Sequence, residues 1–433
     1  MNTIVLSLHG CPLSGLGFMG NEWIAAPNLD RFAAEGIVFD RHVSDNPAPA
    51  AARRAWRSGR MQTPNFRSET PPAGNDLVRL LNAAGIRTVL LEAVRTGHES
   101  APEFYVDWSE KFIARPAGDD RTPMDAVLRM LPDLGVGPWC LWIELDAMLP
   151  PWDIPTDVFA AYIDADEDDE ADDMVKQPDA EFEDEPESEE PEVPEIPVAA
   201  DFSLRAEEPS EPEPILPWHH PTTGWFDEDD EASLALLQAS FAAALTTFDA
   251  DLGRLLARFR ERKWDESAAW FLTTDFCFPL GEHGQLGSHR PWLHEELVHL
   301  PLAVRLPKAE QAGRRVSHFT QPPDLMPTLL ARHGIAIPPG IDGFDLQPLL
   351  DGGSKALREV AISGASWNGF AEWSIRTEGW TLLLPYMQPH DAEEPREPKL
   401  YERPDDRWEV NDLYVRNLGT ADDLEAELRR RLS

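Results

Sequence analysis

The sequence predicts an α/β protein built on a doubly wound, mainly parallel sheet with helices on both faces. Short apolar runs alternate with helical patterns, and Gly36 and Gly85 stand where two helices are expected to end. The strand-like runs are apolar throughout, which is typical of strands covered on both faces. A change of pattern after residue 355 adds a small C-terminal α+β subdomain with a short antiparallel sheet.

The first third of the chain supplies three of the predicted strands. The run TIVLSL at 3–8 opens the sheet, and the runs RTVLLE at 87–92 and WCLWIEL at 139–145 continue it. Segments 28–36 and 76–85 carry apolar residues at helical spacing. We therefore expect a helix at each of these two segments.

An acidic segment interrupts the alternation, which then resumes. Residues 164–216 are rich in proline, and residues 164–213 hold 23 Asp or Glu against two basic residues, more than half of the net charge of −40. Such a segment has too little apolar surface to fold, so we expect a disordered insertion. A long helix at 233–262 and strands at 268–274 and 301–307 follow it.

The predicted organisation is one interrupted domain followed by a smaller one. Residues 1–163 and 217–355 make the α/β domain, and residues 356–433 make the C-terminal subdomain. The strand-like segments EVAISG, EWSIRT and WTLLLPY indicate the antiparallel sheet, and a helix is expected at 421–432.

Charge and composition limit the expected partners. Without the insertion the chain still carries about −19, so a nucleic-acid partner is not expected. The sequence contains no run of 18 apolar residues, so no membrane span is expected. The opening MNTIVLSLHG is interpreted as a strand and not as a signal peptide. The three cysteines are far apart and form neither a disulfide framework nor a metal motif. We expect a cytoplasmic protein without a membrane partner.

Polar motifs follow several predicted strands, at the sheet edge where functional groups of α/β proteins gather. They include LHG at 8–10, DNPAPAAARRAWRSGR at 45–60 and TTDFCFPLGEHG at 273–284. Together with APNLDRFAAEG, HEELVHLPLAVRLP and DLMPTLLARHGIAIPPGIDGFDLQPLL, they resemble the sulfatase family of the alkaline-phosphatase superfamily in order and spacing. The resemblance covers nearly the whole chain outside the insertion and implies the same fold.

The resemblance implies a nucleophile that this chain lacks. Similar sulfatases use a Cys or Ser, converted to formylglycine, in a C/S-x-P-x-R motif ahead of a closing T-G-R. Counting back from SGR at 58–60 places Pro49 at the nucleophile, Ala51 at the motif proline and Arg53 at the arginine. Proline offers no hydroxyl or thiol, so only the arginine of the motif is kept.

The resemblance also implies a Ca²⁺ site, most of whose ligands are missing. The acidic ligands after the first strand correspond to His9 and Gly10, and Asp275 is the one carboxylate left in the later motif. Calcium takes about six to eight oxygen ligands, so no cofactor is expected. His9 and Asp275 could hold a metal that accepts nitrogen, such as Zn²⁺, although two ligands are few. Asp275 could instead bond backbone amides of its own loop.

The other candidate residues have a functional and a structural interpretation. Arg53 could keep a contact with a small anion such as sulfate or phosphate, or it could brace the turn into its helix. His283, in LGEHG, could act as a general base or hold its turn. The family's later lysine corresponds to Ser288, with His289 next to it. Its earlier helper groups fall near Ala93 and Arg95 and on Met148.

We therefore predict a sulfatase-family protein that is catalytically inactive and keeps the scaffold for a binding or regulatory role. The alternative is an active sulfuric- or phosphoric-ester hydrolase with an unconventional site, for instance a water activated by His9 or His283. A general base contributes about 10²–10⁴ in rate. Slow ester hydrolysis needs far more than this. The insertion is either a solvated surface loop or a tether for a basic protein or for cations.

Overall fold

The fold is described from a computed structural model of the chain. It describes residues 1–64, 75–93, 101–118, 120–146, 148–163, 214–287, 293–389 and 396–432. The predicted disordered insertion spans residues 164–216, and its residues 164–213 lie outside this range, as do Arg95, Ser288 and His289. Those predictions therefore stay predictions.

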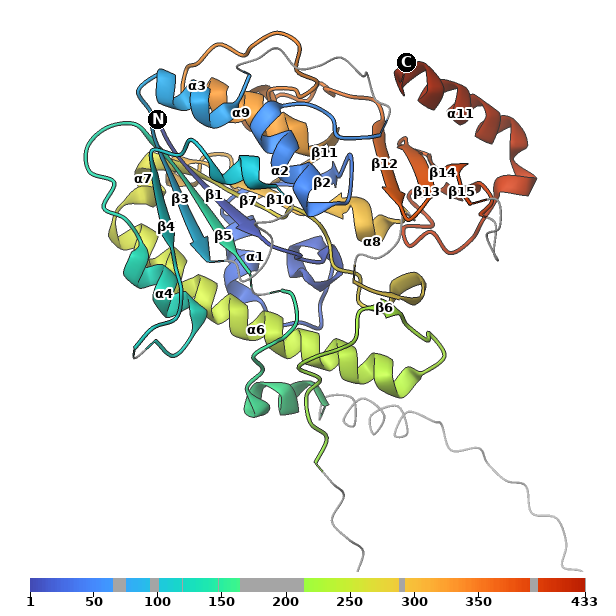
Figure 1. Ribbon diagram of the computed structural model, residues 1–433, viewed down its shortest axis with the longest axis horizontal. Coiled ribbons are helices and arrows are strands. Elements are labelled where there is room, and N and C mark those ends of the chain that lie inside the picture. The colour runs from blue at the N-terminus through green and yellow to red at the C-terminus, as the bar shows by residue number, and fades with distance from the viewer. Residues whose placement is uncertain are drawn as a thin grey trace, which may run out of the picture.

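Over the described residues, a nine-stranded sheet forms the centre of the larger domain (Figure 1). Its strands are β1 (Asn2–Leu8), β2 (Ile37–Val43), β3 (Arg87–Ala93), β4 (Glu110–Ile113), β5 (Trp139–Leu145), β7 (Ala268–Thr273), β9 (His299–Leu300), β10 (Leu302–Arg305) and β11 (Arg314–Thr320). The order is β11-β2-β10-β7-β1-β5-β3-β4, with β9 paired to β2. All pairings except those of β9 and β10 are parallel, so the predicted mainly parallel sheet is confirmed.

The direction of β10 and the strands β2, β4 and β11 of this sheet were not predicted. β10 runs antiparallel to both β7 and β2, because an apolar run specifies burial on two faces but not direction. β2 was missed because Asp40 and Arg41 interrupt its apolar run. The edge strand β11 was missed because it is largely polar, and the edge strand β4 because it has only four residues, two of them charged.

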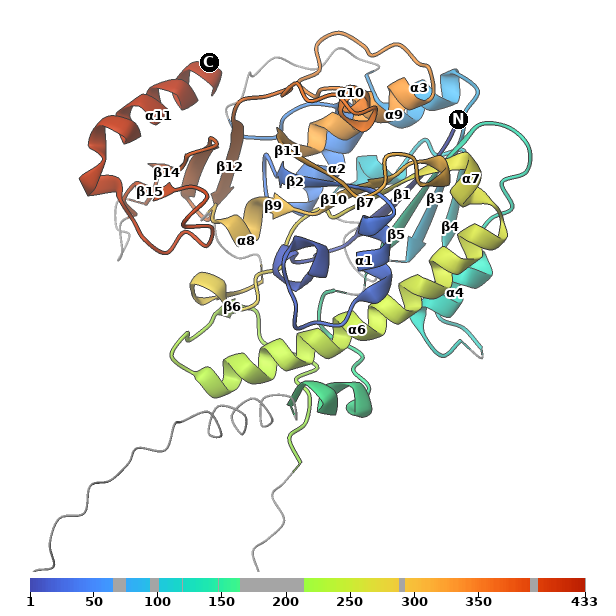
Figure 2. The same ribbon diagram turned by 180° about the vertical axis from the view of Figure 1, so that it is seen from behind.

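Helices cover both faces of the sheet, as predicted (Figures 1 and 2). Val5 of β1 faces one layer and its neighbours Ile4 and Leu6 face the other, and all three are fully buried. The strand is therefore apolar throughout because each face meets a helix layer. One layer contains α2 (Pro49–Ser58), α3 (Leu77–Ala83), α9 (Leu325–Arg332) and α10 (Gln347–Leu350), and the other contains α1 (Pro27–Ala34), α4 (Pro123–Met130) and α6 (Glu231–Glu261).

The long helix α6 was predicted at 233–262 and is confirmed. Its length and composition alone would let it cross a membrane, but half of its most apolar window is buried inside the protein. Phe241, Leu252 and Phe259 pack into the same core as one face of the sheet. Here α6 is a core helix. Further short elements are the helices α7 (Trp264–Ser267) and α8 (Glu295–Val298) and the paired strands β6 (Gly224–Trp225) and β8 (Gln285–Leu286).

The C-terminal subdomain is an antiparallel sheet with one helix, as predicted. Strands β12 (Ala361–Trp367), β13 (Phe370–Arg376), β14 (Trp380–Met387) and β15 (Lys399–Glu402) pair in chain order. The helix α11 (Leu418–Leu432) packs on them through Leu424 and Leu428. The sequence predicted three strands, and the fourth, β15, was missed because four residues make too short a pattern.

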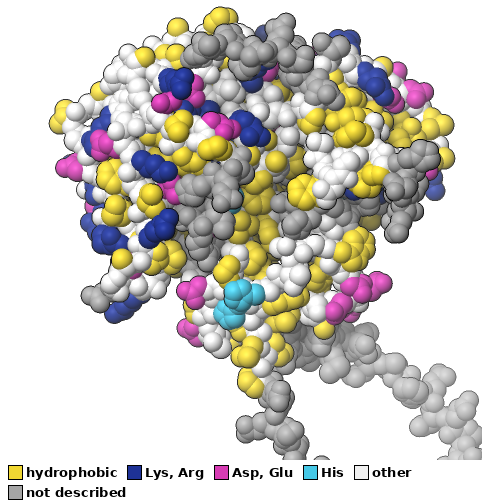
Figure 3. Space-filling model, in the orientation of Figure 1, with side chains coloured by type: hydrophobic (Ala, Val, Ile, Leu, Met, Phe, Trp, Pro, Cys, Tyr) yellow, Lys and Arg dark blue, Asp and Glu magenta, His cyan; other side chains and the backbone are white. Residues whose placement is uncertain are grey.

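The described surface carries both signs of charge. On the face shown in Figure 3, basic side chains are interspersed with acidic ones. This fits a chain in which residues 164–213 alone hold more than half of the net charge of −40.

Candidate functional site

The helix α2 carries Arg53 to the carboxyl ends of the central strands. Pro49 is its first residue, where a missing N–H leaves no helical hydrogen bond unmade. Gly59, at φ 65°, ends the helix in the left-handed conformation that favours glycine. The predicted turn from loop into helix is confirmed. Ala52 and Trp56 pack in the core, and Arg53 beside them is 1% exposed.

Arg53 is held between two carboxylates and beside a histidine. Its Nε donates to Oε1 of Glu144 at 3.1 Å, and its Nη2 lies 3.0 Å from Oδ2 of Asp275. Nδ1 of His9 lies 2.6 Å from that same oxygen and 3.4 Å from Nη2 of Arg53. All four side chains are buried. We call His9, Arg53, Glu144 and Asp275 the strand-end cluster.

Burial and charge oppose each other in the strand-end cluster. Burial acts to lower the pKa of His9, but the carboxylate of Asp275 outweighs it, so this pKa is raised. Burial acts to raise the pKa of Asp275, but His9 and Arg53 together leave it lowered. The pKa of Glu144 stays raised because burial outweighs the attraction of Arg53. The raised pKa of His9 and the lowered pKa of Asp275 both favour a charged pair between these two side chains.

The loop after β1 has no room for an acidic ligand at Gly10. Its backbone N–H points to Oδ1 of Asp275 at 3.4 Å, and its φ is 73°. A Cβ at this position would clash with the side chain of Leu149. The resemblance implies an acidic metal ligand here, whereas the local backbone conformation favours glycine.

The residues present do not fit a calcium ion. Both oxygens of Asp275 are engaged within the protein, by Arg53, His9 and the amide of Gly10. The ring of Phe276 stands edge-on to His9, with centroids 5.1 Å apart. Over the part of the chain that the structure describes, no three His, Cys, Asp or Glu side chains are grouped so as to hold a metal ion. An oxygen-rich set of about six ligands is not assembled by these residues.

His283 lies in a different group from the strand-end cluster. Its Nδ1 is 2.9 Å from Oε1 of Glu296, and its Nε2 is 3.3 Å from the carbonyl oxygen of Glu409. Its ring stacks on that of His294 at 3.9 Å. His283 adopts φ 48° and so holds a tight turn while joining it to the C-terminal subdomain. This geometry favours the structural interpretation of His283.

The helper positions that the structure describes carry no catalytic group. Ala93 ends β3, and Met148 is buried in the core. The thiol of Cys11, in the loop after β1, is fully buried, and burial raises its pKa to about 12. A thiol that stays protonated at neutral pH is a poor nucleophile.

Glu144 is the cluster member that the sequence analysis missed. It lies in β5, where all seven residues are buried and the other six are apolar. A carboxylate in such a strand requires a buried cation or proton, and Arg53 was the available cation. The sequence therefore did indicate this cluster member, as a single charged residue within an apolar strand.

Comparison with known proteins covers nearly the whole chain. Residues 9–335 match the family described as Sulfatase, and residues 281–433 match N-sulphoglucosamine sulphohydrolase, C-terminal. The chain is 28% identical over 182 residues to an N-acetylglucosamine-6-O-sulfatase of Bacteroides thetaiotaomicron, which is 40% of this chain and 31% of that protein.

Two further matches agree with this result. A multifunctional alkaline phosphatase superfamily protein of Trinickia caryophylli is 31% identical over 129 residues, 29% of this chain and 24% of that protein. The matches therefore span less than a third of each of these two curated relatives. The phosphonate monoester hydrolase of Agrobacterium radiobacter shares the fold, with a TM-score of 0.68 at 18% identity over 100% of this chain and 96% of that chain.

Proposed function

The chain belongs to the sulfatase family, whose members normally hydrolyse sulfuric esters, and from this premise we propose that it is a member without catalytic activity that acts by binding. One observation carries the proposal. The arginine and the carboxylate that the family resemblance assigns to anion and metal, Arg53 and Asp275, hold each other at 3.0 Å. Each is nearly inaccessible to solvent.

The nucleophile position supports the same proposal. Pro49 has no group that can attack sulfur or phosphorus, and the residues on either side of it, Ala48 and Ala50, have none either. Without nucleophile and metal, the remaining polar groups could supply only general acid-base assistance, about 10²–10⁴ in rate. We therefore propose that Arg53 braces α2 against the sheet rather than receiving a substrate anion.

Turnover assays test this proposal. The full chain is incubated with an aryl sulfate, an aryl phosphate and a phosphonate monoester, each with and without added Ca²⁺, Mn²⁺ or Zn²⁺. We expect rates equal to those of the variant Asp275→Asn in every condition. A metal-dependent rate that Asp275→Asn abolishes would contradict the proposal.

The alternative of an unconventional hydrolase gives a different result in the same assay. Turnover that does not require metal and is lost in His9→Gln or His283→Gln would establish it. The double variant Pro49→Cys with Ala51→Pro restores two motif residues. It is expected to stay inactive because Gly10 still occupies the position of an acidic metal ligand.

A further inference from the structure

A pocket lies at the junction between the α/β domain and the C-terminal subdomain. Its volume is about 280 Å³, and no member of the strand-end cluster lines it. β2 and β11 form one side, and residues 376–378 and 403–407 form the other. Five arginines and three carboxylates line it: Arg41, Arg315, Arg376, Arg403 and Arg407, with Asp40, Glu295 and Glu378. We call this the junction pocket.

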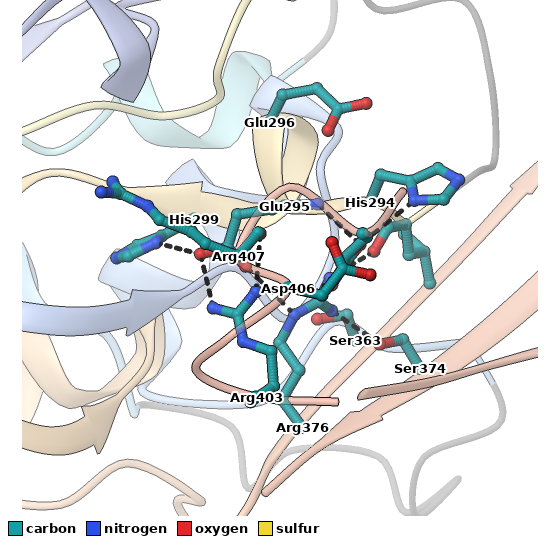
Figure 4. Close-up of polar contacts among 12 residues, drawn as sticks. His294, Glu295, Glu296, His299, Ser363, Ser374, Arg376, Arg403, Asp406 and Arg407 are labelled. Carbon is teal, nitrogen blue, oxygen red and sulfur yellow. Dashed lines mark hydrogen bonds and ion pairs between the residues drawn. The ribbon is translucent and has the colours of Figure 1, made fainter. Parts of the chain in front are cut away.

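Two of these arginines are neutralised inside the protein (Figure 4). Oε1 of Glu295 accepts a hydrogen bond from Nη2 of Arg403 at 2.9 Å and lies 2.6 Å from Nδ1 of His299. Nη2 of Arg376 pairs with Oε1 of Glu409 at 3.0 Å. Glu295 and Glu409 are both buried, so these pairs form a fixed inner wall. A third arginine, Arg315, is paired with Asp40 at the rim.

Arg41 and Arg407 are not neutralised in this way. Both Nη atoms of Arg407 donate to the carbonyl oxygen of Met19 at 3.2 Å. The guanidinium of Arg41 lies 5.4 Å from the ring centroid of Phe319. Among the ion pairs of the described residues, neither has a carboxylate partner. A guanidinium has five N–H donors, so each keeps donors for a ligand.

We propose that the junction pocket binds a small ligand through a tetrahedral oxyanion, a phosphate or sulfate group, held between Arg41 and Arg407. Guanidinium forks match the geometry of such groups and form strong charge-assisted hydrogen bonds with them. Met19, Val43 and Phe319 line the same pocket, so the remainder of the ligand meets an apolar wall. The site is independent of the strand-end cluster and of whether that cluster catalyses any reaction.

The two arginines come from different parts of the chain. Arg41 belongs to β2 of the α/β domain, and Arg407 follows β15 in the C-terminal subdomain. A bound oxyanion therefore bridges the two parts. Its source is either a free inorganic ion or the headgroup of an organic ester, and the apolar wall distinguishes them because only an ester can contact it.

Titration calorimetry of the full chain tests the site, with inorganic phosphate, inorganic sulfate and phenyl phosphate at constant ionic strength. We expect Arg41→Gln and Arg407→Gln each to weaken binding about tenfold or more. The control Arg258→Gln removes the same charge from an exposed position on α6, where it pairs with Glu261, and should leave the affinity unchanged. Tighter binding of phenyl phosphate than of inorganic phosphate would identify an organic ester.

The outcomes separate a specific site from general attraction. Equal weakening in Arg258→Gln would overturn the proposal, because it would mean that overall charge causes the binding. Unchanged affinity in both Arg41→Gln and Arg407→Gln, or no binding of any probe at about 10 mM, would overturn the proposal too. Arg41→Lys keeps the charge but not the fork, and it should bind with intermediate affinity in a protein with wild-type melting behaviour.

Discussion

The strand-end cluster and the junction pocket both place arginines beside carboxylates, yet only the pocket keeps positive charge for a ligand. In the cluster, Arg53 meets two carboxylates and is 1% exposed. In the pocket, Glu295 pairs with Arg403 and Asp40 pairs with Arg315, whereas Arg41 and Arg407 have no carboxylate partner among the ion pairs of the described residues. A buried arginine between two carboxylates is therefore weaker evidence of anion binding than a half-buried arginine without a carboxylate partner. Whether a guanidinium can bind an anion therefore depends on whether a neighbouring carboxylate already pairs with it.

The largest effect is expected from removing the cation of the strand-end cluster. Arg53→Met leaves Glu144 and Asp275 buried without it, and breaking a buried ion pair in this way costs about 3–5 kcal/mol of the free energy of unfolding. Arg54→Met, one residue on, removes an exposed arginine that pairs with Glu103 and should cost no more than about 0.5 kcal/mol. Urea unfolding measures both. If Arg53→Met lowered the free energy of unfolding by less than about 1 kcal/mol, Arg53 would not be held by its carboxylates as described, and the contrast between the strand-end cluster and the junction pocket would not hold.

The next largest loss of stability is expected at Gly10, which stands where the family resemblance implies an acidic metal ligand. Gly10→Ala introduces a Cβ at φ 73° against Leu149 and should destabilise the protein by about 2–4 kcal/mol. Gly85→Ala has a similar φ, 78°, with no atom within 4 Å of the new Cβ. It should lose only about 1–2 kcal/mol, the cost of the backbone conformation. Equal losses in the two variants would show that the strand-end loop can open for a larger residue.

A pH titration sharpens the description of the cluster. The pKa of His9 is raised in the folded state by Asp275, against the effect of burial. Its contribution to stability is therefore complete below the unfolded value of about 6.5 and is lost as pH rises through the folded value. We expect the melting temperature of the wild type to fall as the pH rises above about 6.5 and through the folded pKa of His9, and that of His9→Asn to fall less. Parallel curves would show that His9 stays neutral in the folded protein.

The smallest effect is expected at the junction pocket. Phosphate at ten times its dissociation constant should stabilise the folded protein by about 1.4 kcal/mol through mass action. At the same phosphate concentration, Arg407→Gln with tenfold weaker binding should keep about 0.4 kcal/mol of this gain or less, whereas His9→Asn should keep all of it, measured as melting temperature with and without phosphate. The opposite pattern would move the anion site to the strand-end cluster.

Much of the fold followed from the sequence because apolar periodicity reports burial. It correctly gave β1, β3, β5, β7 and the helix layers on both sides of them. It did not give the direction of β10, which depends on the partners that the strand meets. Edge strands such as β11 were missed because one exposed side dilutes their apolar pattern.

The candidate site was predicted in part. His9, Arg53 and Asp275 follow the rule that functional groups gather at strand ends, and the structure brings them together. Glu144 was overlooked inside its apolar strand. The junction pocket could not be predicted, because Arg41 looked like an interruption of a strand and Arg407 belongs to a loop far along the chain. Only the packing of the two parts brings them to one cavity.

The buried ion pairs behind the junction pocket bear on how the protein unfolds. Glu295 of the α/β domain receives Arg403, and His294 of the same domain lies 3.1 Å from Glu409 of the C-terminal subdomain. Separating the two parts would leave charged groups without their partners on both separated surfaces. The free-energy cost of this loss cannot be recovered by either part alone. The chain should therefore melt in one cooperative transition, with a single peak in calorimetry, and a fragment ending before β12 should be insoluble.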